Sequence, residues 1–233
     1  MMYKSLLQRV IDSFLPHHCA ICEKLLVGSE EHLCVSCLAS LPFTNLWQHP
    51  YDNEMAQMFW HLIPIERSSA LFTYRSHSPS AQLLYRLKYN HQPELGIYLG
   101  ELLAMKAMET GFFEGVDAII PIPLTKERQK MRGYNQCMMI AKGIVEKYQL
   151  PILENALQRV SFHESQTHKN RWQRQENVEQ VFRLTHQVDL SGKHLLIIDD
   201  VCTTGATIVA CCKELMKAGN VKFSVLTVGL TES

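Results

Sequence analysis

The feature that most constrains the fold is an uninterrupted apolar run, residues 195–198, followed at once by two carboxylates, Asp199 and Asp200. Such a run is typical of a strand buried on both faces, as in a parallel sheet. Residues 203–207 then read Thr-Thr-Gly-Ala-Thr, and residues 208–217 have the composition of a helix. The order of strand, acidic pair, tight turn and helix therefore predicts an α/β fold.

The same order of elements predicts a binding site. In an open α/β sheet, ligands bind beyond the carboxyl ends of the strands, and N–H groups that open a helix favour an anion such as phosphate. Threonine hydroxyls add donors, and Gly205 lets the backbone approach the ligand closely. Asp199 and Asp200 would repel phosphate, but they suit vicinal hydroxyls or a Mg²⁺ ion that bridges to the ligand. A ribose 5′-phosphate with free hydroxyls fits both halves.

Residues 195–207 resemble the signature of the type I phosphoribosyltransferases, which bind phosphoribosyl pyrophosphate (PRPP). By this resemblance, Asp199 and Asp200 hold the ribose hydroxyls and the turn after them holds the 5′-phosphate. The implied binding set is Asp199, Asp200, Val201, Thr203, Thr204, Gly205, Ala206 and Thr207, joined by Lys88. Two rival nucleotide-binding motifs, G-x-x-x-x-G-K-[ST] and G-x-G-x-x-G after a strand, do not occur in the sequence.

A second buried strand is predicted at residues 117–124, where prolines stop an apolar run. It leads into residues 125–136, which we interpret as a loop rich in basic residues, before a helix over residues 137–148. A PRPP ligand needs a second anion site, because pyrophosphate leaves readily only when cations and Mg²⁺ meet its developing charge. We therefore expect Arg128 and Arg132 to form one clamp at the pyrophosphate. The alternative is a solvated charged loop.

The other elements follow from shorter apolar patterns. Further strands are predicted at residues 70–74, 156–160 and 221–230, helices at 80–89 and 93–108, and a connector over 38–66. Residues 164–178 are polar and have no apolar face. This segment fits a solvated helix or a lid that closes over a site. Its basic residues around Trp172 could instead contact single-stranded nucleic acid; they are Lys169, Arg171 and Arg174.

Two C-x-x-C pairs near the N-terminus supply four cysteines, Cys19 with Cys22 and Cys34 with Cys37. Four thiolates on two turns are typical of a closed tetrahedral Zn²⁺ site with a structural role. The loop between the pairs has no core of its own, so the metal would supply its folding energy. A disulfide or redox pair is the weaker alternative, because a redox C-x-x-C does not occur in tandem. A histidine could also replace one cysteine; the candidates are His17, His18 and His32.

Composition limits the class of protein. Basic and acidic residues number 23 each, and this balance argues against a protein that mainly neutralises a nucleic-acid backbone. No apolar run is long enough to span a membrane. Residues 1–15 favour a short amphipathic helix that packs on the protein, with membrane binding as the less favoured alternative. Eight cysteines without a secretory signal indicate a reducing compartment, so a cytoplasmic location is expected.

Together these motifs resemble the competence protein F (ComF) family across nearly the whole chain. Members join an N-terminal four-cysteine zinc knuckle to a phosphoribosyltransferase domain, and they are linked to DNA uptake and natural transformation in bacteria. The matching segments, besides the cysteine pairs and residues 199–207, are 87–89, 121–124, Arg128, 132–136, Gln166, Thr167, Arg171 and Asn177. Where the family often has glycine, this chain has Asn90 and His91. Asparagine tolerates left-handed backbone well.

The resemblance implies a type I phosphoribosyltransferase-like fold, in which helices flank a mostly parallel sheet, with a small zinc-ribbon-like domain before it. We expect the helix and knuckle to occupy residues 1–50 and the phosphoribosyltransferase-like domain to occupy residues 51–233. Zn²⁺ would be structural, and Mg²⁺ would accompany PRPP.

Three functions compete. The first is a Mg²⁺-dependent transferase that moves the phosphoribosyl group of PRPP to an acceptor that the sequence does not name, with Asp199, Asp200, Arg128 and Arg132 as the residues closest to the chemistry. The second is a non-catalytic module that senses PRPP or a related nucleotide and contacts components of the DNA-uptake machinery. The third is direct handling of single-stranded DNA. Ligand binding with and without pyrophosphate release separates the first two, and a DNA titration at low salt tests the third.

Overall fold

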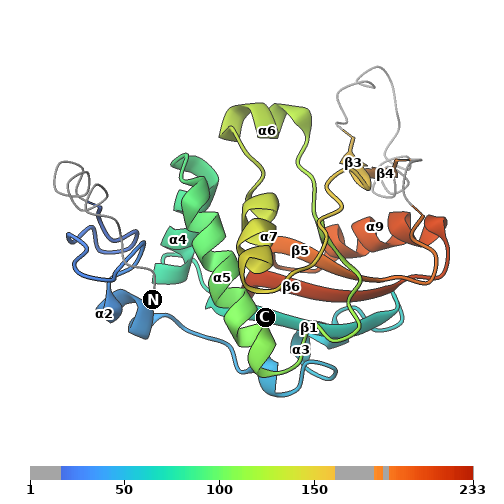
Figure 1. The fold of residues 1–233 in the computed structure, drawn as a ribbon, viewed down its shortest axis with the longest axis horizontal. Helices are drawn as coiled ribbons and strands as arrows, with labels where there is room; N and C mark the ends of the chain where they lie inside the picture. The colour runs from blue at the N-terminus through green and yellow to red at the C-terminus, as the bar shows by residue number, and fades with distance from the viewer. Residues whose placement is uncertain (1–16, 161–180, 186–188, 233) are drawn as a thin grey trace.

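The computed structural model describes residues 17–160, 181–185 and 189–232. Its centre is a four-stranded sheet in the order β1-β6-β5-β2, and every pairing in it is parallel. The strands are β1 (Ile65–Tyr74), β2 (Ala118–Pro121), β5 (His194–Cys202) and β6 (Lys222–Thr231). Helices flank the sheet (Figure 1), so the predicted α/β fold with a mostly parallel sheet is confirmed.

The apolar runs of the sequence form the buried strands of this sheet. β5 is buried from His194 to Ile198, and nearly all of β6 beside it is buried. β2 ends at Pro121, which confirms that a proline closes the strand. β5 continues past the acidic pair to Cys202, further than the sequence predicts, because its last residues still pair with β6 as far as Leu230. The two carboxylates therefore sit on a strand that is held in register.

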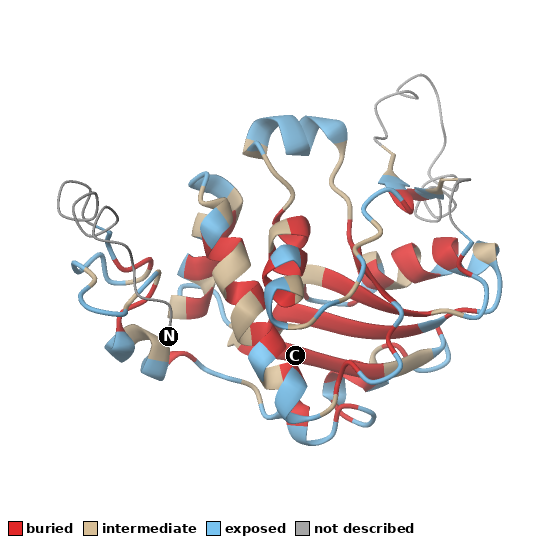
Figure 2. Ribbon diagram, viewed as in Figure 1, coloured by how far each residue is buried: buried red, intermediate tan, exposed pale blue. Residues whose placement is uncertain are grey.

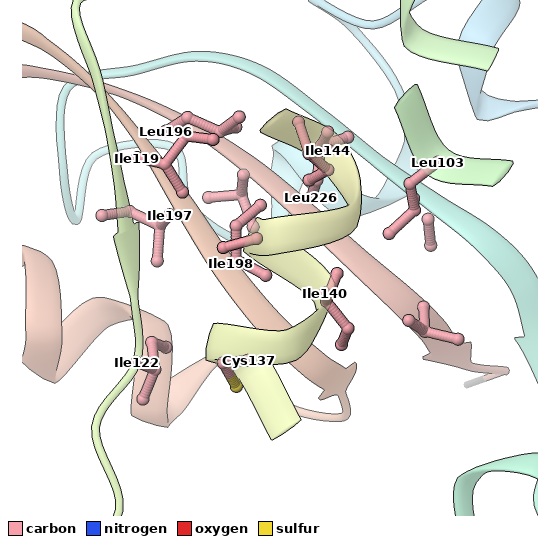
Figure 3. Close-up of a cluster of buried hydrophobic side chains, with 14 of the residues drawn as sticks. Leu103, Ile119, Ile122, Cys137, Ile140, Ile144, Leu196, Ile197, Ile198 and Leu226 are labelled. Carbon is pink, nitrogen blue, oxygen red and sulfur yellow. The ribbon is translucent and has the colours of Figure 1, made fainter. Parts of the chain in front are cut away.

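Four longer helices match the predicted positions. They are α4 (Pro79–Tyr89), α5 (Pro93–Glu109), α7 (Gln136–Lys147) and α9 (Ala206–Leu215), the last continued by the short η3 (Met216–Ala218). α5 and α7 cross closely because each has a glycine at the contact: a Cβ on Gly100 would lie 2.1 Å from the carbonyl oxygen of Ile140, and one on Gly143 would lie 1.9 Å from that of Ile97. Figure 3 shows the side of α7 that carries Cys137, Ile140 and Ile144 packed on the sheet.

The loop predicted for residues 125–136 is wrong, because residues 126–132 form helix α6 (Lys126–Arg132). Thr125 caps its first turn by accepting a hydrogen bond from the N–H of Arg128. Gly133 ends it with the left-handed φ of 79° that favours glycine. α6 has no buried residue and stands apart from the sheet (Figures 1 and 2). Its sequence lacks the apolar stripe by which helices are usually predicted.

A second, two-stranded sheet lies beside α9. It pairs β3 (Leu157–Arg159) with β4 (Phe182–Leu184) in antiparallel fashion, which confirms a strand near residues 156–160. The N–H of Leu184 donates to a carboxylate oxygen of Glu214 on α9 at 3.0 Å. The polar segment 164–178 and the N-terminal residues 1–15 lie outside the described residues, so the predictions for both remain predictions.

The short helix α2 (Val35–Ser40) begins in the second C-x-x-C pair and ends in the predicted connector, which also contains the short helices η1 (Leu46–Gln48) and α3 (Glu54–Gln57). Trp47 and Phe59 from this stretch are buried, and they belong to one continuous apolar cluster that also includes Cys19 and Leu33. The N-terminal knuckle therefore packs on the same core as the sheet. Within the described residues, no helix is both long enough and apolar enough to cross a membrane.

Candidate functional site

The acidic pair meets a lysine from a distant part of the chain. Lys88, near the end of α4, places its Nζ 3.0 Å from Oδ1 of Asp200. Both side chains are mostly buried, with exposed fractions of 24% for Lys88 and 13% for Asp200, so this ion pair is shielded from solvent screening. Lys88, Asp199 and Asp200 are all expected ligand contacts, and the fold brings them together at the carboxyl end of β5.

Asp199 lies in a less polar setting than its neighbour. Its Oδ1 accepts hydrogen bonds from the N–H of Asp200 at 2.9 Å and from the thiol of Cys137 at 3.5 Å. Desolvation raises the pKa of the Asp199 carboxyl to about 7, and the charge of Asp200 raises it too, against the opposing effects of these hydrogen bonds and of Lys88. The group is therefore poised to exchange a proton near neutral pH.

The Thr/Gly turn forms the predicted cradle at the start of α9. Gly205 is the N-terminal cap of this helix and has a left-handed φ of 71°. Thr203, Thr204 and Ala206 are exposed beside the acidic pair, and the N–H of Ala206 donates to the hydroxyl oxygen of Thr204 at 3.4 Å. A helix N-terminus with exposed donors favours phosphate. The arrangement fits the predicted 5′-phosphate site.

The tight turn depends on the absence of a side chain at position 205. A Cβ there would lie 2.7 Å from Cε1 of Phe59, which is fully buried. We expect Gly205→Ala to lower the free energy of unfolding by about 2–3 kcal/mol, because the left-handed backbone and the contact each add a cost. The matched control is Gly192→Ala, since Gly192 also has a left-handed φ of 74° but no heavy atom within 4 Å of a Cβ. Equal losses in denaturant titrations of both variants would contradict the role of Phe59.

The two arginines predicted as one clamp have different surroundings. Arg132, at the end of α6, donates through Nη1 to Oε1 of Gln136 at 2.8 Å, and its Cζ lies 5.4 Å from the ring centroid of Tyr89. Arg128 is exposed. No described contact joins the two side chains, so a shared clamp stays a prediction. Arg132 is pre-oriented by its neighbours, whereas Arg128 is free to reach toward a ligand.

The turn after α4 contains a residue with left-handed backbone. His91 takes the left-handed backbone, with φ of 51°, whereas Asn90 has φ of −102°. The tolerance of asparagine for left-handed backbone is therefore not used at this turn. Tyr134, in the turn before α7, donates its hydroxyl to the carbonyl oxygen of Leu87. This hydrogen bond connects the turn that follows α6 to the end of α4 that carries Lys88.

Sequence reasoning misses one cation near the acidic pair, Arg159 at the end of β3. It is half-buried, and its Cζ lies 5.4 Å from the centroid of the Phe182 ring on β4. Desolvation lowers the pKa of its guanidinium, the charge of Arg128 lowers it further, and Asp199 opposes both. A single arginine in a short strand forms no recognisable sequence motif, so the position of Arg159 follows only from the packing of β3.

The four cysteines of the two C-x-x-C pairs converge as predicted. The sulfur atoms of Cys19, Cys22, Cys34 and Cys37 all lie within 4.8 Å of one another. Cys22 and Cys34 are 3.7 Å apart between sulfurs, close to the edge of about 3.8 Å that a tetrahedron with Zn–S bonds of about 2.3 Å requires. The residues therefore fit Zn²⁺ by donor type and by spacing.

Backbone donors favour the thiolate form of Cys19 in this cluster, whereas burial and the neighbouring thiols raise the pKa of Cys37. The N–H of Cys34 points to the sulfur of Cys19 and the N–H of Cys37 to that of Cys34, both at 3.4 Å. Burial alone would raise the pKa of the Cys19 thiol, but N–H groups around its sulfur lower it to about 6. Among the described residues, no histidine joins this cluster, so the four-cysteine set is favoured over a set with His17, His18 or His32.

The chain is similar in sequence to several known bacterial proteins. No family model matches the chain. It is 30% identical over 145 residues to competence protein F of Haemophilus influenzae, which covers 60% of this chain and 63% of that protein. It is 26% identical over 144 residues to DNA utilization protein YhgH of Escherichia coli K12, with the same coverage. Competence protein ComFC of Bacillus subtilis is 32% identical over 101 residues, which cover 43% of this chain and 39% of that protein. The chain thus spans less than two thirds of these relatives.

Proposed function

Because the chain belongs to the competence protein F family, we propose that it is a phosphoribosyltransferase-like protein of bacterial DNA uptake that binds PRPP together with Mg²⁺. The names of its relatives, competence protein and DNA utilization protein, support a role in DNA uptake. The ligand is supported by the site itself and by the resemblance of residues 195–207 to the phosphoribosyltransferase signature.

The main observation in favour of PRPP is that two groups with opposite preferences lie side by side at the end of β5. One attracts cations or hydroxyl donors, and the other attracts anions. Carboxylates of Asp199 and Asp200 stand directly beside an exposed helix N-terminus that favours phosphate. A simple phosphate would satisfy only the helix, and a simple cation only the carboxylates. A ribose 5′-phosphate satisfies both, because its hydroxyls donate to the carboxylates while its phosphate accepts from the turn.

The remaining groups suit the pyrophosphate end of PRPP. Lys88 and Arg132 are held in place by Asp200 and by Gln136, and Arg128 is exposed nearby on α6. When bound, Mg²⁺ would neutralise charge on the pyrophosphate and so assist its departure. The part of the protein in a transfer step would be to orient the ribose and to stabilise the leaving group.

Isothermal titration with PRPP and Mg²⁺ tests this proposal. Binding to the purified protein is the expected result, and its absence would contradict the proposed ligand. Offering nucleobases and other nitrogen acceptors, and following pyrophosphate release, then separates a transferase from a non-catalytic sensor. Release above the background rate with one acceptor supports transfer. Binding without release from any acceptor supports sensing.

The acidic pair also predicts how affinity changes with pH. The ionised form of Asp199 accepts ribose hydroxyls best, and this form is lost as pH falls through its raised pKa of about 7. We therefore expect PRPP affinity to rise about tenfold between pH 6 and pH 8. Titrations in buffers of different ionisation enthalpy should show proton release on binding near pH 7. The proton uptake of PRPP with Mg²⁺ alone is measured separately and subtracted, and a flat corrected profile would contradict the assignment.

A further inference from the structure

A cavity lies between the N-terminal knuckle and α4. Its volume is about 860 Å³, and both parts of the chain line it. The knuckle contributes Ile21, Cys22 and Glu23, which include one cysteine of the metal cluster. The other side consists of the end of β1, the turn after it and α4, and Figure 1 shows this helix next to the knuckle. The cavity is therefore formed jointly, and it needs both parts to be folded.

Two contacts hold the knuckle side of the cavity in place. Arg86 on α4 donates through Nη2 to Oε1 of Glu23, and this ion pair joins the helix to the knuckle. Glu23 has a left-handed φ of 61°, and its N–H donates to the carbonyl oxygen of Cys19 at 3.0 Å. The position of Glu23 therefore depends on the turn of the first C-x-x-C pair.

The arginine and the lysine that line the cavity already have carboxylate partners. Arg86 pairs with Glu23 across the cavity wall. Lys88 places its Nζ 3.0 Å from Oδ1 of Asp200. An anionic ligand would have to compete with these carboxylates for the same cations, whereas a neutral ligand leaves both ion pairs intact. The charge distribution therefore favours a neutral occupant.

The exposed lining of the cavity is aromatic and amide in character. Tyr85 and Tyr89 on α4 are 61% and 50% exposed, and their ring centroids lie 4.9 Å apart. Gln82 and Asn90 are exposed as well. Tyrosine rings bind flat π-systems by stacking, and each side-chain amide can both donate and accept hydrogen bonds. These groups suit a flat molecule with donors and acceptors along its edge.

We propose that this cavity binds a neutral, planar heterocycle of the nucleobase class. Nucleobases meet every requirement above, because they are flat, uncharged near neutral pH and polar along one edge. A volume of about 860 Å³ lies within the range of about 300–1,000 Å³ that is usual for small-molecule sites. The site goes beyond the proposed PRPP function and does not depend on it. The two sites are neighbours, since Lys88 lines the cavity and also contacts Asp200.

Titration with adenine and with uracil, followed by ligand-detected NMR, tests the site. We expect at least one of them to bind with a dissociation constant below about 1 mM. Tyr85→Leu should weaken this binding roughly tenfold or more, because it removes a stacking surface and keeps apolar bulk. Tyr85 is a cleaner position than Tyr89, whose ring also contacts Arg132.

The matched control is Tyr51→Leu. Tyr51 is 59% exposed, which is close to the value for Tyr85, and it does not line the cavity. This variant should bind the base as the unmodified protein does. Failure of both bases to bind, or equal affinity in Tyr85→Leu and the unmodified protein, would overturn the proposal.

The charge of the ligand is tested with orotate, which is uracil with an added carboxylate. Because the lining cations are already paired, orotate should bind no more tightly than uracil, even at low salt, where attraction between charges is strongest. Tighter binding of orotate would show that the cavity is an anion site, and it would overturn the neutral class of ligand.

The knuckle provides a test that separates this cavity from the PRPP site. Cys34→Ser should lose base binding, because the loss of metal unfolds the side of the cavity that carries Glu23, and it should largely keep PRPP binding. Base binding that survives in this metal-free variant would overturn the joint site. Base binding in a protein that binds no PRPP supports the cavity and rejects the proposed function. PRPP binding in a protein that binds neither base does the reverse.

Discussion

Replacing Asp200 by asparagine is expected to weaken PRPP binding by at least about 100-fold, the largest effect that we predict for any single residue. The change keeps the shape of the side chain but removes the charge that accepts from ribose hydroxyls. It also leaves the ammonium group of Lys88, now 3.0 Å from that carboxylate, without its ionic partner. Calorimetric titration with PRPP and Mg²⁺ measures the effect.

A stability measurement and a control variant show whether the loss of affinity comes from the missing carboxylate. Loss of the shielded ion pair should lower the free energy of unfolding by about 1–3 kcal/mol, so a thermal melt must show that the variant is folded at the titration temperature. The control is Asp52→Asn, at an exposed aspartate that is not among the predicted ligand contacts, and this variant should bind PRPP as the unmodified protein does. Full affinity in folded Asp200→Asn would mean that this carboxylate does not contact the ligand.

Replacing Cys34 by serine is expected to abolish metal binding by the N-terminal knuckle. The sulfur of Cys34 is 3.7 Å from that of Cys22, and it also accepts the N–H of Cys37 in the first turn of α2. Its removal therefore takes away one ligand and one helix cap. We expect zinc to fall from about one ion per chain to near zero, because structural sites of this kind need all four ligands. Elemental analysis of purified protein measures this loss.

The loss of metal should be local in its effect. Residues 17–41 should become sensitive to protease, since the metal supplies the folding energy of a small unit without a core of its own. PRPP binding should be largely retained. Cys212→Ser is the matched control, because Cys212 is a buried thiol in α9 outside the metal cluster. A full zinc complement in Cys34→Ser would show that the ligand set is assigned wrongly.

How far the sequence predicts this fold depends on the length of each apolar pattern. β5 and β6 each contain an apolar run that is buried in the sheet, and α4, α5 and α7 show apolar residues at helical spacing, so all of them are predicted within a few residues. α6 is mistaken for a loop because it buries nothing, and an exposed helix leaves no apolar stripe. Its caps, Thr125 and Gly133, are the signal that could have identified it.

The residues of the candidate site also differ in how well the sequence predicts them. Asp199, Asp200 and the turn after them are contiguous, so one local motif suffices to predict them. The ion pair between Lys88 and Asp200 joins residues that are far apart in sequence, and only the resemblance suggests that Lys88 belongs to the site. Arg159 has no such support, because its position depends on how β3 packs beside α9. Long-range packing is what the sequence does not specify by itself.

The strand order has a consequence for how the chain folds during synthesis. Among the described strands, β6 is the last along the chain, and it lies between β1 and β5. Until the ribosome has released residues 222–231, β1 has no partner in the central sheet and β5 pairs only with β2. The nascent chain thus exposes two apolar strand edges, which favour aggregation. Chains cut before residue 222 should be insoluble or chaperone-bound, and a fusion at that end should be separated from β6 by a linker.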